Sequence, residues 1–425
     1  TQSGFGRTGT VDWNTTKKTG DFTATSGSGF FVDTGGGAIT ATLPASPSAG
    51  DIVAIKDYDG NFGTNKCTVA RNGSNIRGAA SNFDLEKANS GATFIYVDAT
   101  EGWQVFVDGS DADAQQTYIS ASGGTETNSP CGNYKIHTFT GPGTFTVNSL
   151  TCCTSRDKVD YVVVAGGGGG GRACAAGAGG AGGFRESHSA AISGPYTASP
   201  LATPSSLDVS VQGYPIVVGG GGTGAPGPTA PSNPGDPGNN SSFSTITSAG
   251  GGGGGADPQP GSNGGSGGGG AHGSGSGGSG NTPPVSPAQG NNGEATSTPS
   301  PTTTDDGGGG GGGAIEAGGT DLAGEGGDGA PTEINGSATF FAGGGGGGMR
   351  NTPQSQSPAA RSGGQGGGGT GGGSPSYPRP NSDASGDAGT TNTGGGGGGG
   401  TRLQPNPGGS VGSGGNGGSG IVIIR

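Results

Sequence analysis

The chain lacks features on which membrane proteins and nucleic-acid-binding proteins depend. No apolar run reaches 18 residues, so we predict no membrane-spanning helix. No lysine follows Lys158, and the net charge is −12. A polyanion would find few counter-charges on such a surface, and we therefore expect no nucleic-acid partner.

Sequence motifs of catalytic and metal sites are also missing. There is no GxSxG or HExxH motif, and the glycine runs lack the GK[ST] ending of a phosphate loop. The most obvious acidic pair, Asp305 and Asp306, is adjacent, and neighbours in an extended chain face opposite ways. Glycoside hydrolysis needs two carboxylates facing each other across a cleft. We therefore predict no enzyme activity, no cofactor and no metal site.

Cysteines are few and odd in number, and none belongs to a CxxC pair or has a histidine at metal-ligand spacing. We expect them to be small buried hydrophobic residues. A disulfide from Cys131 to Cys152 or Cys153 is an alternative that the sequence leaves open. The five are Cys67, Cys131, Cys152, Cys153 and Cys174.

Residues 1–110 have the pattern of a small all-β domain. Short segments such as GAITATLP and DIVAIKDY alternate apolar and polar residues, and each ends in turn residues. The turns ASPSAGD and DYDGNFG are typical of hairpins. We predict a sandwich or jelly-roll-like fold here, followed by a polar linker over residues 111–132.

Residues 133–165 predict a β anchor for the glycine-rich region. YKIHTFTGPGTFTV reads as two strands of a hairpin around Gly141-Pro142-Gly143, and YVVVA as a buried strand. Residues 166–420 then contain blocks of four to seven consecutive glycines, separated by polar, proline-bearing segments of irregular length. Residues 421–425, IVIIR, predict a closing strand that pairs with YVVVA.

Glycine dominates the second part of the chain. Of 109 glycines, 22 lie in residues 1–160, which leaves 87 in the remaining 265 residues. This is the collagen fraction of about one third, but the G-X-Y period is missing. Disorder is the simplest interpretation of such composition. The two strands that bracket the glycine region argue against it, because a flexible linker does not need its ends clamped together.

Runs of glycine can form polyproline-II-like helices, with three residues per turn, a rise of about 3.1 Å and no internal hydrogen bonds. Every main-chain N–H and C=O must then find a partner on a neighbouring helix. Such helices can approach closely only if internal positions have no Cβ. We predict a bundle of polyglycine-II helices with almost no α-helix, whose structural core includes Gly168, Gly253, Gly309, Gly345 and Gly397.

Residues 133–425 resemble the glycine-rich domain of phage tail-fibre and adhesin proteins. The resemblance lies in DYVVVAGGGGGG, GGFRE, FSTITSAGGGGGG, FFAGGGGGG and GGSGIVIIR. It implies a sandwich of polyglycine-II helices whose variable loops contact a host receptor. FVDTGGGAITATLPASPSAGDIVAIKDYDGNFGTN also resembles a β domain of marine-phage virion fibre proteins, which favours a fibre that carries its own stem.

We therefore expect an extracellular virion tail-fibre protein that binds a host glycan or outer-membrane protein and other virion tail or fibre proteins, as a homotrimer. Alternatives are a structural fibre or decoration protein without receptor binding, and a polysaccharide depolymerase. Receptor contact is expected in residues 349–361 and 374–393, with Asn281–Asp306 as the next choice. The candidate residues are Tyr377, Arg379, Asn381, Met349, Arg350 and Arg361.

Overall fold

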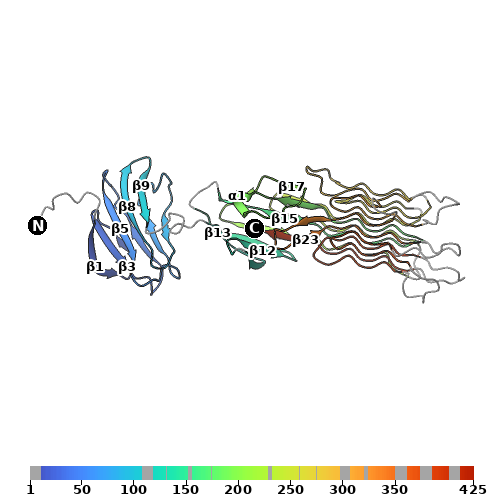
Figure 1. Cartoon of the computed structure of the whole chain (residues 1–425), viewed down its shortest axis with the longest axis horizontal. Coiled ribbons are helices and arrows are strands. Elements are labelled where there is room, and N and C mark those ends of the chain that lie inside the picture. The colour runs from blue at the N-terminus through green and yellow to red at the C-terminus, as the bar shows by residue number, and fades with distance from the viewer. Residues whose placement is uncertain are drawn as a thin grey trace, which may run out of the picture. The chain divides into compact units, whose positions relative to one another are not determined.

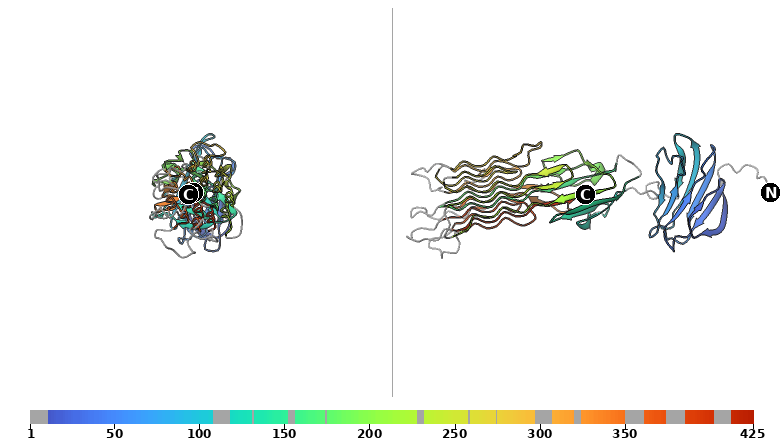
Figure 2. Two further views of the ribbon diagram at one scale, coloured as in Figure 1. Left: turned by 90° about the vertical axis from the view of Figure 1, so that its right-hand side faces the viewer. Right: turned by 180° about the vertical axis from the view of Figure 1, so that it is seen from behind.

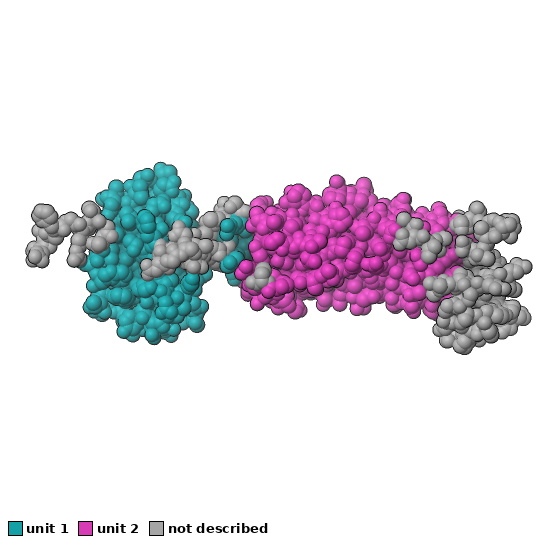
Figure 3. Space-filling model, in the orientation of Figure 1, with its two compact units in different colours: residues 1–120, 149–157 teal, residues 121–148, 158–425 magenta. Residues whose placement is uncertain are grey.

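The computed structural model consists of two compact units, which Figure 3 distinguishes by colour. One comprises residues 1–120 and 149–157, and the other residues 121–148 and 158–425. The regular structure is almost entirely β, as predicted, and the one helix among the described residues is α1 (Ala190–Ser193). No helix in this part of the chain is long and apolar enough to cross a membrane. The structure describes residues 11–107, 118–130, 132–151, 156–173, 175–227, 232–257, 259–273, 275–296, 307–319, 324–349, 361–373, 385–401 and 412–425.

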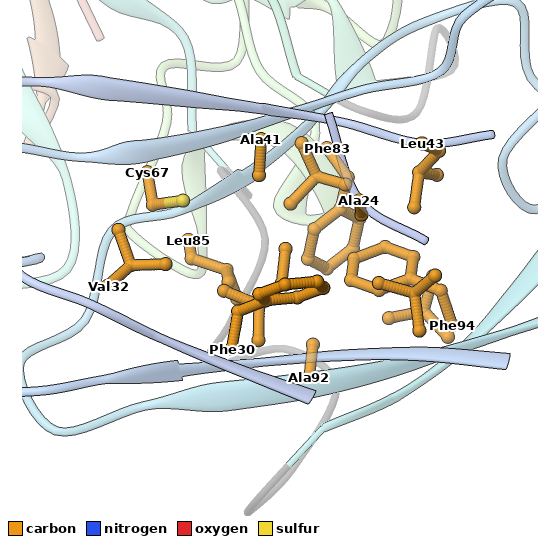
Figure 4. Close-up of a cluster of buried hydrophobic side chains, with 14 of the residues drawn as sticks. Ala24, Phe30, Val32, Ala41, Leu43, Cys67, Phe83, Leu85, Ala92 and Phe94 are labelled. Carbon is orange, nitrogen blue, oxygen red and sulfur yellow. The ribbon is translucent and has the colours of Figure 1, made fainter. Parts of the chain in front are cut away.

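The first unit is a β-sandwich of two sheets, with strand orders β1-β3-β5-β8-β9 and β2-β4-β6-β7. Alternating apolar side chains of both sheets form one core, part of which Figure 4 shows. Cys67 belongs to this core, and burial raises the pKa of its thiol to about 12, as expected for a buried hydrophobic residue. The other four cysteines lie outside the described residues. The strands are β1 (Asp12–Lys18), β2 (Phe22–Thr23), β3 (Ser28–Val32), β4 (Ile39–Thr42), β5 (Ile52–Asp57), β6 (Cys67–Ala70), β7 (Phe83–Leu85), β8 (Gly91–Asp98) and β9 (Gly102–Val107).

The hairpin interpretation of two turns in this unit is wrong. ASPSAGD joins β4 to β5 and DYDGNFG joins β5 to β6, and each connection crosses from one sheet to the other. The chain alternates between the sheets, so β1, β3 and β5 pair in parallel, as do β2, β4 and β6. Asp57 organises the second turn, because its buried carboxylate accepts bonds from the N–H groups of Gly60, Asn61, Phe62 and Asn89. Turn residues indicate where a strand ends but not which sheet the chain enters next.

The second unit begins with two larger sheets, with strand orders β10-β13-β19-β20-β21 and β11-β12-β24-β15-β16-β17. Two small pairs, β14 with β18 and β22 with β23, accompany them. The strands are β10 (Ser120–Ser122), β11 (Thr125–Asn128), β12 (Lys135–Phe139), β13 (Gly143–Ser149), β14 (Lys158–Val159), β15 (Tyr161–Val164), β16 (Phe184–Ser187), β17 (Ala202–Thr203), β18 (Leu207–Asp208), β19 (Gly213–Val217), β20 (Ser241–Phe243), β21 (Ile246–Ser248), β22 (Ala330–Thr332), β23 (Thr339–Phe341) and β24 (Ile421–Ile424).

The predicted pairing of the two bracketing strands is confirmed: β15 and β24 are antiparallel, with Val163 opposite Val422. The predicted hairpin is wrong, since β12 pairs with β11 and β24 while β13 pairs with β19 in the other sheet. Part of the predicted linker also belongs to these sheets, because it contributes β10 and β11. Alternation identified the strands correctly but could not assign their partners.

Eight strands continue directly into extended glycine-rich segments, which we call rods (Figures 1 and 2). Six consecutive glycines, 166–171, follow β15 after the single residue Ala165. At a rise of about 3.1 Å per residue such a segment is roughly 19 Å long. The rods attached to strands are 166–171, 177–183, 219–225, 235–239, 250–255, 324–329, 343–348 and 412–420.

The main-chain bonds of rod 166–171 repeat every three residues. Its N–H groups donate, in chain order, to the carbonyl oxygens of Asn239, Gly418, Gly180, Asp236, Gly415 and Gly177. Its carbonyl oxygens accept, in the same order, from the N–H groups of Gly251, Gly222, Gly397, Gly254, Ala225 and Gly400. Residues three apart therefore bond to the same neighbouring rod, which is the threefold geometry of polyglycine II.

Six rods surround this central rod, three as acceptors and three as donors. Each of the six also bonds to the next, so they form a closed ring in the order 177–183, 250–255, 235–239, 219–225, 412–420 and 394–400. Rods 177–183 and 343–348 are enclosed by six neighbours in the same way. The rods therefore pack hexagonally, and the bundle's interior consists of main chain.

The five glycines predicted to form the core are all buried in this bundle. A Cβ added at any of them would lie 1.9–2.3 Å from a carbonyl oxygen of a neighbouring segment. The five are Gly168, Gly253, Gly309, Gly345 and Gly397.

Rods on the outside of the bundle have a different sequence pattern. In rod 219–225 and the residues after it, Gly220, Thr223 and Pro226 are exposed while the residues between them are mostly buried. Rod 412–420 shows the same period, because Ser413, Asn416 and Ser419 are half-buried or exposed. One residue in three faces solvent, and at that position a side chain is tolerated.

We predict that Gly397→Ala destabilises the protein by more than about 2 kcal/mol, because the new methyl group overlaps the carbonyl oxygen of Gly415. Gly220→Ala is the matched control, since its Cβ would meet nothing closer than the Asn239 side chain at 3.7 Å. The control should be neutral or stabilising by about 0.4–1 kcal/mol through the unfolded state. Denaturant melts of the two variants check this, and equal midpoints would contradict a main-chain core.

Candidate functional site

The described residues do not form an evident catalytic or metal centre. No group of three or more His, Cys, Asp or Glu side chains among them is arranged to hold a metal ion. The most enzyme-like cluster surrounds buried Asp160, whose carboxylate accepts bonds from the hydroxyls of Ser187 and Ser193 and from the N–H of Ser189. These bonds tie α1 to β15 and β16, which is a structural role.

A second buried carboxylate, that of Glu186, holds a similar position between segments far apart in the sequence. Its oxygens accept bonds from the N–H of Ser199 and the hydroxyl of Thr332. Burial raises the pKa of this carboxyl, and the two bonds oppose the shift. The cluster connects β16 to β22, so we assign it to the assembly of the unit.

The end of the bundle away from the sheets is formed by a network of cross-links that we call the distal layer. It comprises Arg172, Ala175, Gly307, Met349 and Thr401. Ala175 bridges to Thr401 and Gly307 to Met349, while the Thr401 hydroxyl donates to the Met349 carbonyl. Arg172 bridges to Asn233 in the same layer. All the rods represented here therefore end at one level.

Described residues that flank several segments outside the description lie at this end of the bundle. Gly412 donates to the Thr401 carbonyl, which joins the two residues that flank 402–411, and Met349, before 350–360, donates to Gly372, near the start of 374–384. The segments are 228–231, 297–306, 320–323, 350–360, 374–384 and 402–411. They differ in length and composition.

Two of the predicted receptor-contact residues belong to the bundle itself. Met349 and Arg361 are buried, at 5% and 7% exposure. The Arg361 guanidinium donates to the Gly308 carbonyl at 2.5 Å and occupies the space above Gly307 and Gly324, where a Cβ would collide with it. Direct receptor contact by these two side chains is therefore at odds with their positions, because packing against glycine holds both inside.

The other candidates cannot be placed, because Tyr377, Arg379, Asn381 and Arg350 lie outside the described residues. The range 374–393 is divided by the structure: residues 385–390 form a rod bonded to 367–370 and 413–416. The alternative range 281–306 is divided too. Asn281 and Thr282 bond to Gly265 and Gly264 near the sheets, so its first part lies at the opposite end from the distal layer.

The sequence contains a pattern for the outer rods that is missed when only runs of consecutive glycines are considered. GSGGNGGSG and GSGGSG place a non-glycine residue at every third position, which matches one solvent-facing residue per turn. Continuous glycine blocks, by contrast, indicate rods enclosed on all sides. A polar residue at every third position would have identified these outer rods, whereas alanine at the same period, as in Ala178 and Ala181, occurs in an enclosed rod.

A family model for a glycine-rich domain matches residues 138–425. The chain belongs to this glycine-rich domain family. The matched range runs from β12 through the sheets and the whole bundle to β24. No curated protein matches the chain.

We predict that Arg361→Ala lowers the melting temperature, because it removes the bond to the Gly308 carbonyl and empties a space between rods. The expected cost is about 2–3 kcal/mol. Thermal denaturation followed by circular dichroism measures it. If the variant melts like the parent but binds host cells more weakly, Arg361 is a receptor contact after all.

Proposed function

We propose that this protein is a receptor-binding tail fibre of a virion, in which the bundle displays variable segments to a host-cell glycan or outer-membrane protein. The observation that carries the proposal is the distal layer. Described residues that flank six segments of four to eleven residues lie at this end of the bundle, next to rods that consist largely of glycine.

In the second unit, the inner rods provide the packed structure, and we propose that the segments that join rods provide the contacts to a receptor. At the inner glycines a Cβ would overlap a neighbouring main-chain atom, and the only side chains in the enclosed rod 177–183 are the buried methyl groups of Ala178 and Ala181, so inner rods offer a partner no chemical information. Segments that join rods are free of this restriction and can change in length without moving the rods. A base of bonded rods suits recognition, since it fixes the points at which each connecting segment is attached.

The resemblance of residues 133–425 to phage adhesins favours the adhesive interpretation over an enzymatic one. The family model over residues 138–425 supports the glycine-rich part of that resemblance. The sandwich of the first unit would serve as the stem that connects the bundle to other virion tail or fibre proteins. A structural fibre without receptor binding is the alternative, and an adsorption experiment separates the two.

We predict that the purified chain binds host cells and competes with virions for adsorption. Replacing Tyr377 and Arg379 together with Ala should weaken this binding and leave the melting temperature unchanged, because a rigid Tyr beside an Arg in a proline-rich segment is suited to contact a sugar or protein loop. Replacing Thr223 and Asn239, on the side of the bundle, is the matched control. Unchanged binding in the double variant would redirect the search to residues 297–306.

We also predict a homotrimer organised by residues 1–150. The outer face of the sheet β1-β3-β5-β8-β9 exposes Trp13, Tyr58, Val97 and Phe106, and apolar area of this kind commonly marks an interface. Light scattering of the intact chain at micromolar concentration measures the mass. A monomer under those conditions contradicts the prediction.

A further inference from the structure

Residues 412–425 form an extended segment whose main-chain bonds go mostly to distant parts of the chain. It consists of rod 412–420 followed by β24. Every main-chain partner that the structure gives it, apart from Thr401 and Gly395 to Gly398, lies more than twenty residues away in sequence. The rest of the unit therefore holds the segment in place. We call the position that the segment occupies, between β12 and β15 in the sheet and along the side of the bundle, the slot.

On the sheet side, β24 fills the gap between two halves of a six-stranded sheet. It pairs with β12 through Thr138 opposite Ile423, and with β15 through Val163 opposite Val422. All four residues of β24 are buried. Without this strand, β11 and β12 have no main-chain pairing to β15, β16 and β17 within the sheet.

On the rod side, the segment lies on the surface of the bundle and bonds to four rods. These are 166–171, 219–225, 385–390 and 394–400. Its outward positions are Ser413, Asn416 and Ser419. The rod can therefore leave its place without displacing any other rod.

The slot recognises the segment through main chain and apolar side chains. No charged residue occurs from Gly412 to Ile424. Arg425 completes the fit: it exchanges two main-chain bonds with Asp160, and its guanidinium lies about 5 Å from the ring centres of Tyr134 and Tyr196. None of these contacts depends on whether the segment and the slot belong to the same molecule.

The covalent link to the segment is long enough to reach another molecule. Residues 402–411 connect it to Thr401, and ten residues extend to at most about 33–36 Å. An element exchanged between identical chains keeps all its contacts, so exchange costs little free energy.

We propose that the slot between β12 and β15 is an interaction site for a second copy of this chain, which inserts its own residues 412–425. The exchanged assembly contains two complete bundles joined by two crossing links. It forms during folding, when slots are open, and its share increases with protein concentration.

The test uses two full-length chains with different tags, one carrying Val163→Cys and the other Val422→Cys. They are unfolded together, refolded and run on a non-reducing gel. Because positions 163 and 422 are directly paired, exchange places the new thiols side by side, and we expect a covalent heterodimer whose yield rises with concentration. A second mixture, of a chain with Thr138→Cys and a chain with Ile423→Cys, tests the contact with β12 on the other side of the slot.

Controls establish that the heterodimer reports insertion. A single chain with both Val163→Cys and Val422→Cys should cross-link internally. Mixing Val163→Cys with Thr146→Cys, which faces Gly213 in the other sheet, should give no heterodimer beyond that of the native cysteines. Adding Gly417→Ala to the donor should abolish the product, because its Cβ would lie 2.1 Å from the Gly167 carbonyl oxygen, whereas Ser413→Ala should not.

Internal cross-linking in the double variant, with no heterodimer from either mixed pair at any concentration, overturns the proposal. A heterodimer that persists with Gly417→Ala overturns it too, since the product would then not require the slot. Loss of host-cell binding by the parent chain would contradict the proposed function but would leave this result unaffected.

Discussion

The bundle depends on main-chain hydrogen bonds that join an inner rod to neighbours on all sides. Its N–H groups donate to three rods, and its carbonyl oxygens accept from three others. In a β-sheet, a strand bonds to two neighbours within one plane. In rod 166–171, successive residues point to successive neighbours, so six rods are joined to it without any side chain between them. A buried N–H without a partner costs about 1–3 kcal/mol, so a single misplaced rod would leave several such groups unpaired. Hexagonal closure satisfies all of them at once.

This requirement explains why many of the rods adjoin a β-strand. The rods have no buried apolar side chain larger than that of alanine with which to fix their own register. The sheets supply that register, because strands such as β15 and β24, whose residues are all buried, adjoin rods. The hydrophobic effect therefore acts at one end of the unit, and hydrogen bonding carries the order to the other.

The same constraint sets which positions of the bundle tolerate a side chain. Substitutions at inner glycines are limited by overlap with neighbouring main-chain atoms, whereas outer rods accept a side chain at the solvent-facing third position. Met349 precedes residues 350–360 in the sequence and Arg361 follows them. Both side chains are nevertheless buried among glycines. Proximity in sequence to a variable segment is thus a poor guide to exposure at this end.

The sequence by itself determined the all-β character, the pairing of YVVVA with IVIIR and the glycine core, because β-branched runs and the absence of Cβ atoms each have a direct physical meaning. Only the tertiary structure decided which rod bonds to which, that β12 and β13 belong to different sheets, and that Met349 and Arg361 are buried. The reason is the same in each case. Side-chain patterns report the environment of a residue, whereas partners in this protein are chosen by main-chain bonds, and every glycine offers the same donor and the same acceptor.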